Sequence, residues 1–180
     1  MKGLHNALFF ILLLALYSCK KEDNSGLPGC CDMPLINETF GVTGSAHVYV
    51  PNVFTPNADG INDVLFVNGD SVQIIIFFEI RNADNELVFH VGNIEVNDTA
   101  NGWDGKVNGS VQKGLYDVSL EVMADDGTIA DFTGKVCNYP CGFGDEGDMV
   151  PAAHCQFPVQ VTDGLFDPTI QPGESPNCFK

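Results

Sequence analysis

The loop between Pro51 and Asp63 holds the side chains with the clearest capacity for chemistry. It reads Pro-Asn-Val-Phe-Thr-Pro-Asn-Ala-Asp-Gly-Ile-Asn-Asp, so Asn57, Asp59 and Asp63 stand at alternate or near-alternate positions. Carboxylate, amide and main-chain carbonyl oxygens are the ligands that calcium takes, and the glycine in this run permits a sharp turn around an ion. The spacing therefore predicts a partial calcium site formed by Asn57, Asp59, Asp63 and the carbonyl of Ile61.

The same loop has a second interpretation that needs no ion. In an EF-hand register Thr55 would stand at position 1 and Phe66 at position 12, and a phenylalanine cannot chelate. The alternative is a network of Asx-turns, in which the side chains of Asn57, Asp59 and Asp63 bond to backbone amides of the loop. The sequence leaves both interpretations open.

The N-terminus predicts export and a lipid anchor. An apolar run from Ala7 to Tyr17 is too short to span a bilayer but has the length of a signal-peptide core. Leu16-Tyr17-Ser18-Cys19 resembles a bacterial lipobox, so we expect a signal peptide over residues 1–18 and acyl chains on Cys19. Such chains would hold the protein on a membrane. The alternative is an ordinary signal peptide that a cysteine happens to follow.

The remaining cysteines predict a disulfide framework. The chain has seven cysteines, and setting Cys19 aside leaves a set that can pair completely: Cys30, Cys31, Cys137, Cys141, Cys155 and Cys178. An exported chain favours disulfides over a metal cluster, and the Cys137-x-x-x-Cys141 spacing lacks a matching second pair. The connectivity stays open.

The charge balance excludes one class of partner. The chain has 24 acidic against 8 basic residues and a formal net charge of −16. Binding to phosphates needs a basic footprint, so no nucleic acid is expected as a partner. Most of the carboxylates are explained by a solvated acidic surface.

The hydrophobic pattern predicts an all-β domain. Residues 72–91 are expected to form a hairpin whose first strand, 71–80, is apolar on both faces. Residues 114–123 alternate cleanly, as in a half-buried strand, and a turn at Asp126-Gly127 leads to a partner strand over 129–136. These features are typical of an immunoglobulin-like antiparallel β-sandwich.

Four segments follow from these patterns. We expect a signal peptide over 1–18, an acylated tether over 19–46, the sandwich over 47–137, and a cysteine-rich tail over 138–180. Within the tail only Val159-Gln160-Val161 resembles a strand. The tail is therefore expected to be irregular and joined to the sandwich by disulfides.

A series of landmarks across the sandwich carries a family resemblance. The Pro51–Asp63 motif is followed in order by the hairpin at Ile80–Phe89, by Trp103-Asp104-Gly105 and by Gly114-Leu115-Tyr116. This series resembles the gliding-motility-associated C-terminal domain, which is also the type B sorting domain of the type IX secretion system of Bacteroidota. The turn at residues 83–85 reads Ala-Asp-Asn where that family has Arg-Trp-Gly. We expect Trp103, which is flanked by glycines, to pack in the core.

The lipobox, the family resemblance and the lack of a catalytic series together predict a non-catalytic lipoprotein of the cell envelope, a structural or interaction module associated with type IX secretion or gliding motility. Lys20-Lys21-Glu22-Asp23, next to the acylated cysteine, resembles a surface-export signal and suggests an outer-membrane lipid anchor at the cell surface. Envelope proteins, secretion-machinery proteins or surface glycans are the expected partners. The alternatives are a type IX sorting signal and a calcium-dependent module that binds glycans or peptides. No enzyme is expected, because the histidines are scattered and no Ser-His-Asp series stands out.

Overall fold

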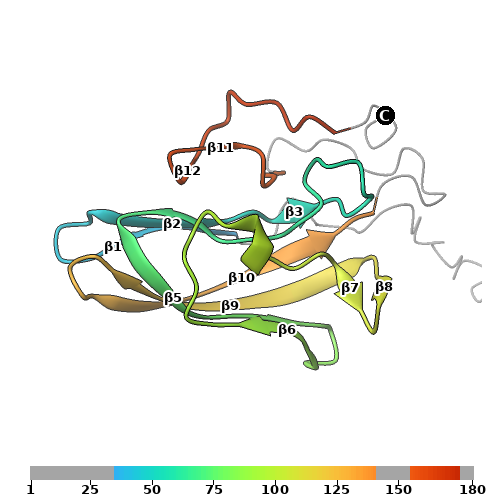
Figure 1. The fold of residues 1–180 in the computed structure, drawn as a ribbon, viewed down its shortest axis with the longest axis horizontal. Coiled ribbons are helices and arrows are strands. Elements are labelled where there is room, and N and C mark those ends of the chain that lie inside the picture. Colours follow the sequence, from blue (N-terminus) through green and yellow to red (C-terminus); the bar gives the residue numbers. More distant parts are fainter. Residues whose placement is uncertain (1–34, 141–154, 175–180) are drawn as a thin grey trace, which may run out of the picture.

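The computed structural model describes residues 35–140 and 155–174 of the chain, and the regular secondary structure of this part is almost all β-strand. Figure 1 shows two stacked layers of strands with a smaller third piece beyond one of them. The strands are β1 (Ile36–Phe40), β2 (Ala46–Val50), β3 (Val53–Phe54), β4 (Asn68–Asp70), β5 (Val72–Arg81), β6 (Leu87–Val91), β7 (Lys106–Val107), β8 (Ser110–Val111), β9 (Gly114–Ala124), β10 (Ile129–Asn138), β11 (Val161–Thr162) and β12 (Leu165–Phe166). A 3₁₀ turn, η1 (Thr99–Asn101), precedes β7.

The two layers are sheets of different size. One has the order β1-β2-β4, and the other has the order β3-β10-β9-β5-β6. All neighbours are antiparallel except β3, which runs parallel to β10 and pairs Val53 with Cys137. The prediction of an all-β sandwich is therefore confirmed.

One hydrophobic core lies between the sheets, and β9 shows why. Its buried side chains alternate with less buried ones, so Tyr116, Val118, Leu120 and Val122 all enter the core, as their spacing predicts. The β9–β10 turn and the β5–β6 hairpin also lie where the sequence predicts them. Gly127 adopts φ +84° in the first turn, and Asn85 adopts φ +63° in the second.

The strand β5 differs from its prediction. Its register shifts between Ile75 and Phe77, and this bulge brings Ile75 and Phe78, three residues apart, into the core. Ile74, Ile76 and Phe77 are only half-buried, so the strand is not covered equally on both faces.

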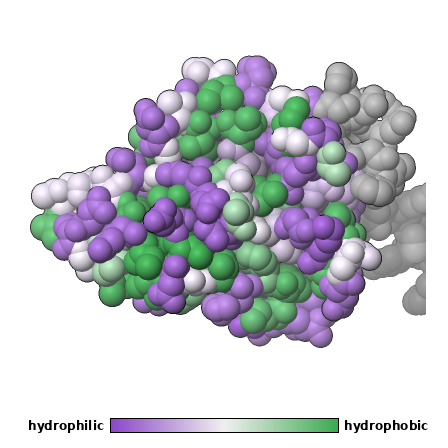
Figure 2. Space-filling model, viewed as in Figure 1, coloured by the Kyte–Doolittle hydropathy of each residue, from purple (hydrophilic) through white to green (hydrophobic). Residues whose placement is uncertain are grey.

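On the face shown in Figure 2, hydrophilic and hydrophobic residues are interspersed, with green areas among the purple ones.

Two parts of the fold lie outside the segment expected to form the sandwich. β1 lies within the segment assigned to the tether, and it pairs along its whole length with β2. β11 and β12 form a small hairpin in the tail, beside β2 in Figure 1. The ring of Phe166 stacks on Tyr49 of β2, with 5.6 Å between ring centroids. The tail thus forms a third layer against the smaller sheet.

Among the described residues, no helix has the length and apolar character needed to cross a membrane. The predicted signal peptide, Cys19 and four of the six disulfide candidates (Cys30, Cys31, Cys141 and Cys178) lie outside the described residues. The other two, Cys137 and Cys155, are each disulfide-bonded.

Candidate functional site

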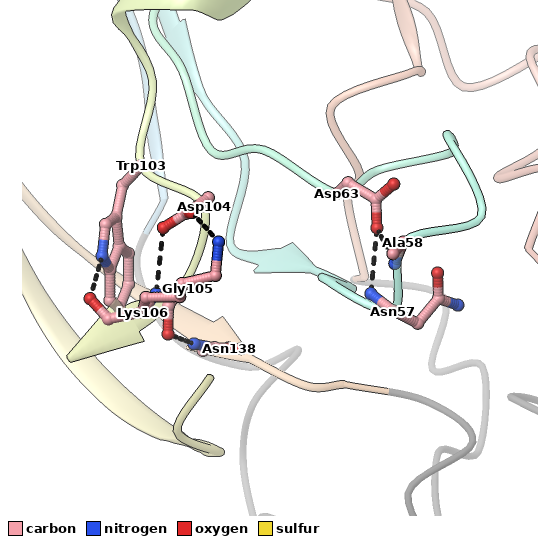
Figure 3. A network of polar contacts seen from close by, with 8 residues as sticks. All are labelled: Asn57, Ala58, Asp63, Trp103, Asp104, Gly105, Lys106 and Asn138. Atoms are coloured by element: carbon pink, nitrogen blue, oxygen red, sulfur yellow. Dashed lines mark hydrogen bonds and ion pairs between the residues drawn. The ribbon is translucent and has the colours of Figure 1, made fainter. Parts of the chain in front are cut away.

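The loop that follows β3 is organised around Asp63. Its Oδ1 accepts hydrogen bonds from the backbone amides of Asn57 and Ala58, at 2.9 and 2.7 Å, as Figure 3 shows. Its Oδ2 accepts a third bond from the amide of Gly60 at 2.7 Å. One carboxylate therefore accepts hydrogen bonds from three backbone amides of the same loop.

The other two predicted ligands complete the same network. The Asn57 Oδ1 accepts from the amide of Asp59 at 3.0 Å, and the Asp59 Oδ1 accepts from the amide of Ile61 at 2.8 Å. The Asn57 Nδ2 donates to the Asp59 Oδ2 at 3.1 Å. These contacts are those of the Asx-turn alternative.

The structure brings Asn57, Asp59, Ile61 and Asp63 into one loop, as the calcium prediction requires. Within residues 35–140 and 155–174, no group of three or more histidine, cysteine, aspartate or glutamate side chains gathers where it could hold a metal ion. Calcium binding at this loop stays a prediction, and the Asx-turn contacts describe what its side chains do in the structure.

The first half of the motif forms β3 and belongs to the core. Val53 and Phe54 are both fully buried, and the carbonyls of Asn52 and Phe54 accept hydrogen bonds from the amides of Cys137 and Tyr139, at 2.8 and 3.0 Å. The apolar residues of the motif thus attach β3 to β10, and the polar residues that follow form the loop.

Trp103 connects this motif to the rest of the domain. It is 2% exposed and packs on Phe54 and Tyr116, with ring centroids 5.4 and 4.8 Å away. Its backbone exchanges two hydrogen bonds with Leu65, and its Nε1 donates to the carbonyl of Lys106 at 3.1 Å (Figure 3). The prediction that Trp103 packs in the core is confirmed.

Three polar residues of the motif are buried, and the sequence did not single them out as a group. Asn52 and Thr55 are 0% exposed and Asn62 is 7% exposed. Their partners lie about a hundred residues further along the chain, between Gln156 and Glu174. The local pattern holds no signal for such distant contacts.

The contacts between the motif and this C-terminal segment are hydrogen bonds in both directions. Asn52 Oδ1 accepts from the amide of Gln156 at 2.9 Å, and the carbonyl of Gln156 accepts from the amide of Val53 at 3.3 Å. The side chain of Asn62 accepts from the amide of Val159 at 2.9 Å and donates to the carbonyl of Pro172 at 2.8 Å. The segment is therefore held mainly through its own backbone.

A buried carboxylate completes this contact. The Oε1 of Glu174 accepts hydrogen bonds from the Thr55 hydroxyl and from Asn62 Nδ2, the latter at 2.7 Å. Burial, together with the charges of Asp59 and Asp63, raises the pKa of Glu174 above its ordinary value, and these two hydrogen bonds oppose the rise.

Comparison with known families identifies the domain that carries this site. Residues 48–135 match the family model CHU_C, described as the type IX secretion signal domain. A search of curated proteins found no match to the chain. The matched residues run from β2 into β10 and include the Pro51–Asp63 motif and Trp103, the landmarks on which the resemblance rests. The part of this chain from residue 48 to residue 135 belongs to the type IX secretion signal domain family.

Proposed function

We propose that this protein is a lipid-anchored, non-catalytic module of the bacterial cell envelope that works with the type IX secretion system. The observation that carries the proposal is the family match over residues 48–135, which spans the core of the sandwich rather than one short motif. That family is described as a secretion signal domain, which supports an association with this system.

Sequence features outside the described residues support the anchor and the location. Cys19 directly follows an apolar run of signal-peptide length and a lipobox-like triplet. Two acyl chains, at about 0.8 kcal/mol per buried methylene, suffice for stable attachment to a bilayer. We place the protein at the outer membrane, facing the cell surface.

The described carboxylates support a role without catalysis. Asp126 accepts hydrogen bonds from the amides of Val42 and Thr128, at 2.7 and 2.8 Å, and Asp98 accepts from the amide of Ala100 at the start of η1, at 2.9 Å. With Asp59 and Asp63, these acids hold turns and loops in place. Their contacts explain the carboxylates as structural groups.

We further propose that disulfides join the tail to an immunoglobulin-like sandwich. Cys137 lies in β10 and is fully buried, Cys155 is the first residue of the described stretch 155–174, and both are disulfide-bonded. The pairing among the six predicted cysteines stays open. Peptide mapping of the unreduced protein would give the connectivity.

The experiment that tests the proposed function compares cells with and without a working type IX secretion system. Intact cells are treated with a protease, and the protein's peptides are measured by mass spectrometry. We expect surface exposure in the normal cells and its loss in the deficient cells. Equal exposure in both would contradict the association.

A sorting signal is the second candidate, favoured by the description of the matched family itself. Fusing residues 48–135 to the C-terminus of an exported reporter tests it. Release of the reporter only in cells with the working system would support this candidate, and retention in both would remove it. The calcium-dependent glycan- or peptide-binding alternative depends on the loop and is tested through calcium itself, below.

A further inference from the structure

The buried polar side chains of the motif all contact a segment that lies outside the matched domain. The family match ends at residue 135, whereas the partners of Asn52, Thr55 and Asn62 lie between residues 156 and 174. These three side chains are therefore buried by a part of the chain that the signal domain itself does not include.

What these side chains recognise is general peptide chemistry. Asn52 and Asn62 bond to the main-chain groups of Gln156, Val159 and Pro172, which any residue can present except where proline lacks the N–H. Side chains that pair with main-chain groups read an extended or turning backbone, as sheet edges do in peptide recognition.

One contact is specific to a side chain. The Oε1 of Glu174 accepts hydrogen bonds from Thr55 and Asn62 at a buried position, and an apolar side chain there would remove this acceptor from both donors. The surface thus selects a segment that carries an acidic residue at this place.

Apolar and backbone packing hold the middle of the same segment. Phe166 stacks on Tyr49, which is fully buried beneath it. At Gly164 an added Cβ would lie 2.2 Å from the carbonyl oxygen of Gly69, so the two backbones meet directly. The segment fits the surface along its length rather than at a single point.

We propose that Asn52, Thr55 and Asn62 form a peptide-docking site on the signal domain, and that this chain fills the site with its own residues 156–174. The ligand class is a peptide that offers main-chain N–H and C=O groups and one carboxylate. A partner that binds the same three side chains must first displace the chain's own segment. In this protein the docking site is therefore occupied by residues 156–174 of the same chain.

Hydrogen exchange of the full chain tests the contact. In Glu174→Ala, the amides of Gln156 and Val159 should exchange about tenfold faster, as expected when a buried hydrogen-bond acceptor is lost. Amides of β9 should exchange at the wild-type rate. The matched control is Glu95→Ala, which removes an exposed carboxylate elsewhere. Unchanged exchange at Gln156 and Val159 in Glu174→Ala would overturn the proposal.

Two further variants, Asn62→Asp alone and Asn62→Asp with Glu174→Gln, distinguish loss of the specific contact from a general loss of stability. Asn62 adopts φ +52°, which aspartate tolerates, so Asn62→Asp keeps the backbone and places a second carboxylate against Glu174. Exchange at Val159 should rise in this variant and fall again when Glu174→Gln is added, because the new amide can donate to the new carboxylate. A double variant that exchanges as fast as the single one would contradict the assigned contact.

A peptide added in trans tests whether the site accepts a separate ligand. The full chain with Phe157→Asp, Phe166→Asp and Glu174→Ala has a weakened segment but intact Asn52, Thr55 and Asn62. A labelled synthetic peptide of residues 156–174 should bind this variant, measured by fluorescence anisotropy, and should not bind wild type. The proposal would be overturned if the peptide bound the variant and wild type equally. It would also be overturned if the peptide bound neither protein while the β9 amides of the variant were still protected. If the variant does not fold, the exchange measurements above decide.

Discussion

The side chain of Asn138 donates a hydrogen bond from Nδ2 to the carbonyl of Gly105 at 2.8 Å, which ties the Trp-Asp-Gly turn to the end of β10 (Figure 3). Gly105 adopts φ +76°, and a Cβ at this position would lie 2.6 Å from Asn138 Nδ2 and 2.8 Å from Pro56 Cγ. The glycine is therefore required both by its backbone angle and by the space available.

Replacing this glycine should destabilise the domain by two separable effects. Gly105→Ala should lower the free energy of unfolding by about 2–3 kcal/mol, from left-handed strain and from the clash with Asn138. Urea unfolding measures the loss. The matched control is Gly109→Ala, since Gly109 adopts φ +84° and an added Cβ would meet nothing within 4 Å. Equal losses in the two variants would show that the close contact has no effect.

Trp103 should be the most costly single truncation in the core. Trp103→Ala removes the ring between Phe54 and Tyr116 and should cost about 3–5 kcal/mol. Trp103→Phe keeps an aromatic ring but loses the Nε1 bond to the Lys106 carbonyl, so its cost should be smaller. Chemical unfolding followed by circular dichroism compares them. Near-wild-type stability of Trp103→Ala would be incompatible with its place in the core.

Asp63 should stabilise its loop without a bound ion. Asp63→Ala leaves the amides of Asn57, Ala58 and Gly60 without their acceptor, and should cost about 2 kcal/mol and speed their hydrogen exchange. Asp84→Ala is the control, because it removes an exposed aspartate from a different turn. The prediction fails if both variants are equally stable.

Calcium provides the complementary test of the same loop. A calcium titration that gives no heat, with a melting temperature that chelation leaves unchanged, would favour the Asx-turn alternative, in which the oxygens of Asp63 accept three backbone amides. A binding heat that disappears in Asp59→Asn, with a rise in melting temperature, would instead establish the calcium site predicted from the sequence.

Docking of the C-terminal segment should weaken as the pH rises. The pKa of Glu174 is raised in the folded protein, so its contribution to stability is fully present below the unfolded pKa and is lost as the pH rises through the folded value. Exchange at Gln156 and Val159, corrected for the intrinsic pH dependence, should therefore increase as the pH rises from below the ordinary pKa of a glutamate through the raised pKa of Glu174 in the folded protein. The same increase in Glu174→Gln would show that another group is responsible.

The sequence predicted those parts of the fold that local pattern determines. The alternation in β9 and the turn at Asp126-Gly127 depend on neighbouring residues, and both were found as expected. The β5 bulge was not predicted. In a continuous apolar run, the hydrophobic pattern does not change where the register shifts after Ile75. The short strands of the tail begin at Val161 rather than Val159, since the amide of Val159 is used by Asn62 instead.

The sequence revealed only part of the candidate site, because only contacts between neighbouring residues leave a local pattern. Asn57, Asp59 and Asp63 bond to amides two to six residues away, so their spacing identified the loop. The contact of Asn62 with Glu174 joins residues 112 positions apart, and no periodicity encodes it. Such pairs become evident only when the tail has folded onto the sandwich.

The central claim is that acyl chains on Cys19 hold this domain at a bacterial membrane, and the mass and location of the mature protein test it most directly. We expect a mature chain that begins at Cys19, carries the added mass of its acyl chains and sediments with membranes, whereas Cys19→Ala should lack that mass and be lost from the membrane fraction. A Cys19→Ala protein of otherwise unchanged mass that still sediments with membranes would contradict it.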